Sequence, residues 1–213
     1  AHPVTLEYGA PLAEAGEPTS AVFFPETAVI SALAPTGRGR GVVMCHVGRE
    51  AYAGEGATLG QARALYSTIV QVGGLARAIT PEDLAALADA FPNLRRALLA
   101  AIQSILYQAK LSSGCIAIHG AKQRIARLIL TIADRTDGAE VALTHQQMAD
   151  FLAVRRATVT EAAKEFQRAG LIDYTRGRVR IIDRAGLTAE SCECYGLIRS
   201  ASLSLLPAAD AAE

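Results

Sequence analysis

The stretch that decides the fold of this chain is LTHQQMADFLAVRRATVTEAAKEFQRAGLI, residues 143–172. Thr144 is followed three residues later by Gln147. This is the spacing of a capping box, which predicts that a helix begins at this point. The pair Ala153-Val154 fits a short turn after that helix. A second helix is predicted to follow and to end at Gly170, because glycine commonly stops helices.

The second predicted helix has two different faces. Apolar and small side chains recur at helical spacing and should point inward; they are Val159, Ala162, Ala163 and Phe166. The outward face then carries Arg156, Ala157, Thr160, Glu161 and Lys164. A short helix, a tight turn and a helix whose first outward residues can form hydrogen bonds predict a helix-turn-helix that enters the major groove of DNA.

A β-hairpin is predicted directly after this segment, over residues 171–183. Ile172 and Tyr174 alternate with polar residues, Arg176-Gly177 forms the turn, and Val179 and Ile181 alternate back. Arginines at positions 176, 178 and 180 crowd the hairpin. They can be a solvated face or can contact phosphates, and beside a helix-turn-helix we favour phosphate contact.

The distribution of charge supports this region as the one that binds DNA. The whole chain of 213 residues has a net charge of zero, with 21 basic and 21 acidic residues. Residues 119–185 carry 12 basic against 8 acidic residues, whereas the segments on either side are net negative. A local basic excess is the electrostatic footprint expected of a DNA-binding domain.

The first part of the chain predicts a β-domain followed by a long helix. Between residues 4 and 79, short apolar runs are separated by Gly, Pro and charged residues, which is typical of a sandwich or barrel. Thr80-Pro81 should begin one helix and Pro92 a longer one that reaches about residue 118. The longer helix carries an apolar seam that predicts a self-pairing coiled coil, the alternative being a helix packed on its own β-domain. The seam consists of Leu94, Leu98, Ile102, Ile105, Ala109, Ser112 and Ile116.

Together these segments predict an α+β protein in four parts. Residues 1–91 should form a β-sandwich or barrel domain, 92–118 a dimerisation helix, 119–186 a winged helix-turn-helix domain and 187–213 a C-terminal extension. His119-Gly120 is the expected hinge between domains, and the stretch from Leu203 onward is expected to be a loose tail.

The chain resembles the cyclic-AMP receptor protein/FNR-type (Crp/Fnr) family of bacterial transcription regulators. The resemblance is strong over about residues 92–184, through AKQRIARLIL, the helix-turn-helix stretch quoted above and YTRGRVRIID. It is weaker over residues 4–80, through LEYGAPLAEAGEP and VFFP. The resemblance implies a jelly-roll sensor similar to cyclic-nucleotide-binding domains, a dimerisation helix and a winged helix that binds palindromic DNA.

The resemblance also implies roles for individual residues. Arg156 matches the recognition-helix arginine that contacts a base edge, and Thr158 matches a position that commonly touches phosphate. Ala157 and Glu161 depart from the family pattern, so the operator should differ from the best-known one. The full set expected to contact DNA is Thr144, Arg155, Arg156, Thr158, Thr160, Glu161, Lys164, Arg176 and Arg178.

The cyclic-nucleotide pocket is expected to be degenerate. In members that bind cyclic AMP, a Gly-Glu pair holds the ribose, and an Arg followed by Ser or Thr holds the phosphate. The matching residues here are Gly54, Glu55 and Arg63, but Arg63 is followed by Ala64, which has no hydroxyl. Losing a good hydrogen bond to a charged group costs about 1.5–3 kcal/mol, so phosphate should bind poorly. A cyclic-nucleotide-responsive regulator remains the alternative.

No enzyme, cofactor or metal site is expected from the remaining residues. Four cysteines are too scattered for a disulfide framework, and Cys192-x-Cys194 lacks the usual two-residue chelating spacing, so reduced thiols are expected. Four histidines spread over three regions argue against a metal-dependent jelly-roll enzyme. We expect a cytoplasmic protein whose partners are double-stranded DNA, a second copy of itself and RNA polymerase, with no membrane. A winged helix that binds another protein is the remaining alternative.

Overall fold

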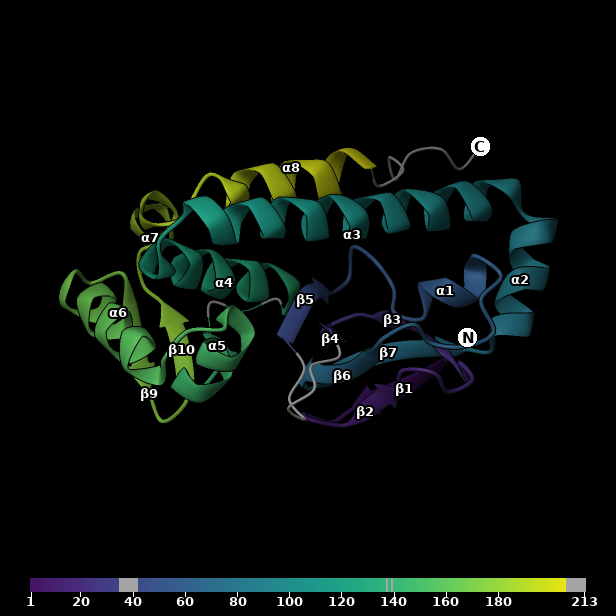
Figure 1. The fold of residues 1–213 in the computed structure, drawn as a ribbon, viewed down its shortest axis with the longest axis horizontal. Coiled ribbons are helices and arrows are strands. Elements are labelled where there is room, and N and C mark those ends of the chain that lie inside the picture. The colour runs from purple at the N-terminus through teal and green to yellow at the C-terminus, as the bar shows by residue number, and fades with distance from the viewer. Residues whose placement is uncertain (35–41, 137, 139, 206–213) are drawn as a thin grey trace.

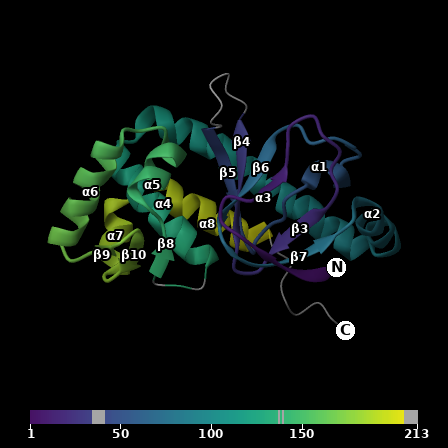
Figure 2. The same cartoon turned by 90° about the horizontal axis from the view of Figure 1, so that it is seen from below.

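The structure, a computed structural model, describes residues 1–34, 42–136, 138 and 140–205. Its longest element is helix α3 (Pro92–Ile118), which runs along one side of the molecule. One end of α3 lies over the N-terminal β-strands, and the other end reaches a second group of helices and strands (Figure 1). The view from below separates the same two bodies (Figure 2). No helix in the described ranges is both long and apolar enough to cross a membrane.

The N-terminal body is a sandwich of two antiparallel sheets, as predicted from the short apolar runs. One sheet has the strand order β1-β7-β3 and the other β2-β6-β4-β5. Alternate residues of both sheets point inward and form the core, which includes Ile30, Ala32, Val47 and Val70. The strands are β1 (His2–Leu6), β2 (Pro11–Ala13), β3 (Val22–Pro25), β4 (Val29–Ala34), β5 (Val42–Val47), β6 (Ser67–Val72) and β7 (Gly74–Ile79).

Three helices complete this half of the chain. A short helix, α1 (Glu55–Thr58), lies between β5 and β6. Helix α2 (Pro81–Ala90) begins as predicted, with the Thr80 hydroxyl accepting a hydrogen bond from the Asp83 amide. Helix α3 then begins at Pro92, also as predicted.

The predicted apolar seam of α3 divides between two faces of the helix. Leu98 and Ile105 are 4% and 9% exposed and pack into the core of their own β-domain, and Leu94 packs beside Leu98. These three residues, and in part the half-buried Ile102, therefore pack within one chain, which is the alternative that the pattern left open. The spacing alone could not distinguish the face of α3 that packs on the β-domain from the face that is accessible. Leu99 and Leu106 directly follow the buried Leu98 and Ile105 and are about half exposed.

The C-terminal body contains the predicted helix-turn-helix and one strand that the sequence did not indicate. Its helices are α4 (Ala121–Arg135), α5 (His145–Leu152) and α6 (Arg156–Arg168). Strands β9 (Ile172–Thr175) and β10 (Arg178–Ile181) form the hairpin, and β8 (Glu140–Ala142) pairs with the outer side of β10. Helix α4 supplies the centre of the core, with Ile125, Ile129 and Ile132 fully buried.

Two further helices end the described chain. Helix α7 (Arg184–Glu190) follows the hairpin, and α8 (Cys194–Leu205) turns back and lies along α3 (Figure 1). Tyr195 and Ile198 of α8 are buried, and the Ser104 and Ser202 hydroxyls of α3 and α8 are 3.1 Å apart. The expectation of a loose tail from Leu203 is wrong for residues 203–205, which continue α8; residues 206–213 lie outside the described ranges.

Candidate nucleic-acid interface

The helix-turn-helix is fixed at its first helix and at its turn. The Thr144 hydroxyl accepts a hydrogen bond from the Gln147 amide, and the Gln147 side chain accepts one from the Thr144 amide, so the capping box is confirmed. Ala153 adopts a left-handed conformation (φ 51°), which ends α5 and turns the chain toward α6. The buried Arg124 guanidinium donates to the Leu152 carbonyl at 2.7 Å and so holds the end of α5 against α4.

Helix α6 is oriented as predicted, with one face in the core and the other face accessible. Val159, Ala162, Ala163 and Phe166 are all buried, at 4% exposure or less. The residues expected to contact DNA lie elsewhere on the helix: Arg155, Arg156, Ala157, Glu161 and Lys164 are exposed, and Thr158 and Thr160 are half-buried. The first turn of α6 therefore presents two arginine side chains to solvent at the end where a recognition helix meets base edges.

Thr160 takes part in a contact that the sequence did not reveal. Its hydroxyl donates to the Arg156 carbonyl at 3.0 Å and lies 3.0 Å from His145 Nδ1. The His145 ring stacks on Tyr174 of the hairpin, with ring centroids 4.1 Å apart. Burial and the nearby Arg156 charge lower the pKa of His145, so its ring is neutral at pH 7. Thr160 thus links the recognition helix to α5 and the hairpin.

The hairpin has the predicted turn, but two of its arginines are ion-paired. Arg176 and Gly177 both have positive φ angles, 50° and 79°, which is the conformation of a tight type I′ turn. Arg178 contacts Glu140 of β8 at 2.9 Å, and Arg180 contacts Asp173 of β9 at 3.1 Å. Within the described ranges, no carboxylate pairs with Arg176, so its charge is the most available on the hairpin.

A polar contact between the two bodies was also missed by the sequence. Arg135, at the end of α4, contacts Glu50 of the β-domain at 2.6 Å, and their side chains are only 5% and 12% exposed. Arg135 also donates to the Gln108 side chain of α3. Burial opposes ionisation of Glu50, but the Arg135 charge and its hydrogen bonds outweigh burial and lower the pKa of Glu50. We call Glu50, Gln108 and Arg135 the interdomain latch.

A second contact lies beside the latch. The His46 ring of β5 packs edge-on against Phe151 of α5, with ring centroids 5.7 Å apart. Burial and the charges of Arg135 and Arg127 lower the pKa of His46 to about 3, so this ring stays neutral. The β-domain therefore touches the helix-turn-helix directly, through a neutral aromatic contact next to a buried ion pair.

The residues matched to a nucleotide pocket are not all brought together. Gly54 and Glu55 line a cavity of about 130 Å³ in the β-domain. Arg63 is exposed, and its guanidinium donates to the Gly16 carbonyl at 2.7 Å. Burial raises the pKa of Glu55. The arginine that would hold a cyclic phosphate thus binds the backbone of its own chain, and the cavity is smaller than the roughly 300–1,000 Å³ typical of ligand sites.

Three of the four cysteines, which lie in two distant parts of the sequence, come together in the structure, and all four are free thiols. Cys115, Cys192 and Cys194 are at most 3% exposed and form one buried cluster. Cys45 alone is separate, in the core of the β-domain. Sequence spacing could not reveal this cluster, because it joins the end of α3 to a loop more than seventy residues later, with the Cys115 and Cys192 sulfurs 3.5 Å apart.

Comparison with known proteins agrees with this arrangement. The family model of the Crp-like helix-turn-helix domain matches residues 123–190. The transcriptional regulator LdrP of Thermus thermophilus is 30% identical over 164 residues, which cover 72% of this chain and 78% of LdrP. Two solved structures have the same fold, each with a TM-score of 0.72. The CRP-family regulator TTHB099 of Thermus thermophilus is 21% identical, with 88% of this chain and 96% of that one covered. FixK2 of Bradyrhizobium japonicum is 14% identical, with 90% and 97% covered. The chain belongs to the Crp/Fnr family of transcription regulators and carries their helix-turn-helix DNA-binding domain.

Proposed function

We propose that this protein is a sequence-specific regulator that binds a palindromic operator as a homodimer in the cytoplasm, with a degenerate nucleotide pocket. The observation that carries the proposal is the first turn of α6. There Arg155 and Arg156 are exposed, while Val159 and Phe166 of the same helix are fully buried and fix its rotation. A helix held this way can place Arg156 against a base edge in the major groove.

The proposed DNA contacts are of two kinds, contacts to base edges and contacts to phosphates. Arg156 is the proposed base-reading residue, because a bidentate arginine–guanine pair is the commonest specific contact. Thr144, Arg155, Thr158 and the hairpin arginines are proposed to contact phosphates, which position the protein without reading the sequence. Arg178 must first exchange its Glu140 partner for a phosphate, so Arg176 is the stronger phosphate contact.

The dimer is proposed to form through the accessible face of α3. Leu99, Leu106 and Ile116 are 50%, 51% and 58% exposed on this helix. Ile102 and Ala109 lie between them, at spacings of three, four and three residues from Leu99 to Ala109 and seven residues from Ala109 to Ile116, which fits a coiled-coil seam. This face shares Ile102, Ala109 and Ile116 with the seam expected from sequence and replaces Leu94, Leu98 and Ile105, which are occupied in the β-domain. Ser112, the remaining residue of that seam, is half-buried.

The proposal is tested by selecting an operator from random DNA and then measuring variants on it. Arg156→Ala should lose about 1–3 kcal/mol on the selected operator and relax the preference at one base pair per half-site. Arg168→Ala is the matched control, since it removes an exposed arginine from the far end of the same helix. Arg176→Ala should weaken cognate and random DNA alike and reduce the salt slope by about one unit.

Three results would contradict the proposal. A selected pool without two-fold symmetry would remove the dimeric operator, and an Arg156→Ala variant with unchanged sequence preference would remove this helix as the reader. A winged helix that binds protein instead of DNA would show no steep fall of DNA affinity with salt.

A further inference from the structure

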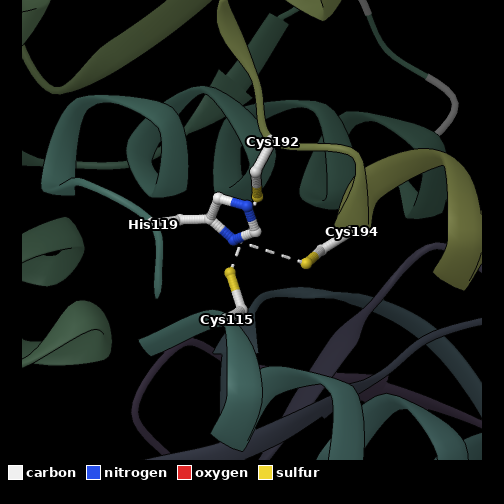
Figure 3. Close-up of side chains that lie close together, drawn as sticks. All are labelled: Cys115, His119, Cys192 and Cys194. Carbon is white, nitrogen blue, oxygen red and sulfur yellow. Dashed lines mark hydrogen bonds between the residues drawn. The ribbon is translucent and has the colours of Figure 1, made fainter. Parts of the chain in front are cut away.

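Four side chains that commonly bind metals meet where α3 ends and α8 begins. They are Cys115, His119, Cys192 and Cys194, and their sulfur and nitrogen atoms all lie within 4.8 Å of one another (Figure 3). The Cys115 and Cys192 sulfurs are 3.5 Å apart, and the Cys194 sulfur is 3.7 Å from His119 Nδ1. The three cysteines are at most 3% exposed and the His119 side chain 10%, so the group is closed to solvent.

The imidazole is oriented as a ligand. Its Nδ1 faces the sulfurs, and its Nε2 lies 3.0 Å from the carboxylate of Glu193. A carboxylate on Nε2 places the ring proton there and leaves the Nδ1 lone pair free to bind a metal ion. Metal-binding histidines almost always have such a carboxylate or carbonyl partner on their second nitrogen.

The spacing of the four atoms matches a single tetrahedral ion. With metal–sulfur distances of about 2.3 Å and a metal–nitrogen distance of about 2.0–2.1 Å, a tetrahedron separates two sulfurs by about 3.8 Å and a sulfur from the nitrogen by about 3.6 Å. The Cys115 and Cys192 sulfurs are 3.5 Å apart, the Cys194 sulfur lies 3.7 Å from His119 Nδ1, and none of the six separations exceeds 4.8 Å. We propose that Cys115, His119, Cys192 and Cys194 bind one Zn²⁺ ion, a site beyond the DNA-binding function of the family.

The chemistry of the ligands favours zinc over the other thiophilic groups. Three thiolates and one imidazole form one of the usual sets of structural zinc sites, which are closed by four protein ligands. An iron–sulfur cluster binds its thiolates on separate irons and needs a wider ring of ligands. Binding releases three thiol protons and leaves the site with a net charge of −1, and Arg127 lies close enough for its charge to act on all three sulfurs.

The position of the ion indicates a structural role. Cys115 and His119 belong to the end of α3, whereas Cys192 and Cys194 flank the start of α8. The ion would join these two segments beside the connection from α3 to α4, where the DNA-binding body begins. Zinc would therefore hold α8 in its place along α3 and brace the connection to the helix-turn-helix.

The test is metal analysis of the full chain, purified without air and without a metal-binding tag. We expect about one zinc per chain by mass spectrometry of the metals. Cys194→Ser and Cys192→Ser should each abolish stoichiometric zinc, whereas Cys45→Ser, the matched control in the β-domain core, should keep it. Glu193→Gln removes no ligand and should weaken zinc binding about 10–100-fold in a chelator competition. The Glu193 side chain is 66% exposed, so this variant should fold as the wild type does.

Replacing the zinc of the wild-type protein with Co²⁺ gives a spectroscopic test that needs no variant. The absorption bands of tetrahedral cobalt bound to thiolates are the expected result. Four results would overturn the proposal: zinc content unchanged in Cys194→Ser, absence of these bands, iron with acid-labile sulfide in the purified chain, or a Cys115–Cys192 disulfide in protein kept free of air.

Discussion

Replacing Glu50 by Gln tests whether the interdomain latch stabilises the folded protein. The substitution keeps the size of the side chain and one oxygen acceptor but removes the charge that faces Arg135 at 2.6 Å. Because both side chains are nearly buried, the Arg135 charge would remain in the interior, with Gln108 as its other polar partner among the described residues. Breaking a buried pair in this way costs about 3–5 kcal/mol, and the retained oxygen places the expected loss near 3 kcal/mol.

Urea denaturation at pH 7, followed by circular dichroism, measures this loss. With an m-value near 3 kcal/mol per molar, the expected shift of the midpoint is about 1 M. Glu26→Gln is the control, because it removes an exposed carboxylate whose pair with Arg77 is worth at most about 1 kcal/mol. A Glu50→Gln loss no larger than that of the control would refute the reasoning.

The effect should also depend on pH, with a sign that follows from the lowered pKa of Glu50. Because the pKa of Glu50 is lower in the folded protein than in the unfolded chain, its ionised carboxylate stabilises the fold above the unfolded-chain pKa of about 4.3. This contribution disappears as the pH falls through the pKa of Glu50 in the folded protein. The difference between wild type and Glu50→Gln should therefore shrink below about pH 4. Gly48→Ala gives a second perturbation, because a Cβ at that position would lie 2.5 Å from Arg135 Cγ and displace the arginine.

Two further predictions concern the dimer and the pocket. Leu106→Arg, on the accessible face of α3, should convert a dimer into a monomer of 22.3 kDa in sedimentation at micromolar concentration, whereas Leu75→Arg, an equally exposed leucine on β7, should not; a dimer that survives Leu106→Arg would exclude this face. Calorimetry should detect no binding of cyclic AMP or cyclic GMP at physiological concentrations, and saturable binding that Arg63→Ala abolishes would show that the pocket is functional after all.

The features that sequence analysis identified correctly are those set by residues near one another in the chain. The capping box of Thr144 and Gln147 needs only a three-residue spacing, and the inward face of α6 needs only helical periodicity. The positive-φ pair Arg176-Gly177 is likewise a local signal for a turn. Local patterns were enough here because caps, turns and helix faces are determined within a few residues.

The features that were missed depend on which distant segments pack together. Periodicity showed that α3 has an apolar stripe, but it could not show which part of the stripe is buried. The neighbouring residues Ile105 and Leu106 lie in the core and in solvent respectively. Helix α8 has no charged residue except Arg199 and was taken as an extension, because only contact with α3 distinguishes it from a free segment. The latch and the cysteine cluster join residues 85 and 77 positions apart, for which a single sequence has no signal.

These missed contacts determine how the DNA-binding body sits on the β-domain. Helix α4 is about 22 Å long at 1.5 Å per residue and forms the centre of the core on which α5 and α6 pack. Its last residue, Arg135, is held by Glu50 of the β-domain and Gln108 of α3. Its first residue follows directly after His119-Gly120, beside the cysteine cluster on α3. A rotation of α4 would carry α6 with it, and the contacts of Arg135 with Glu50 and Gln108 oppose such a rotation. The orientation of Arg156, the proposed base-reading residue, therefore depends on residues far outside the helix-turn-helix.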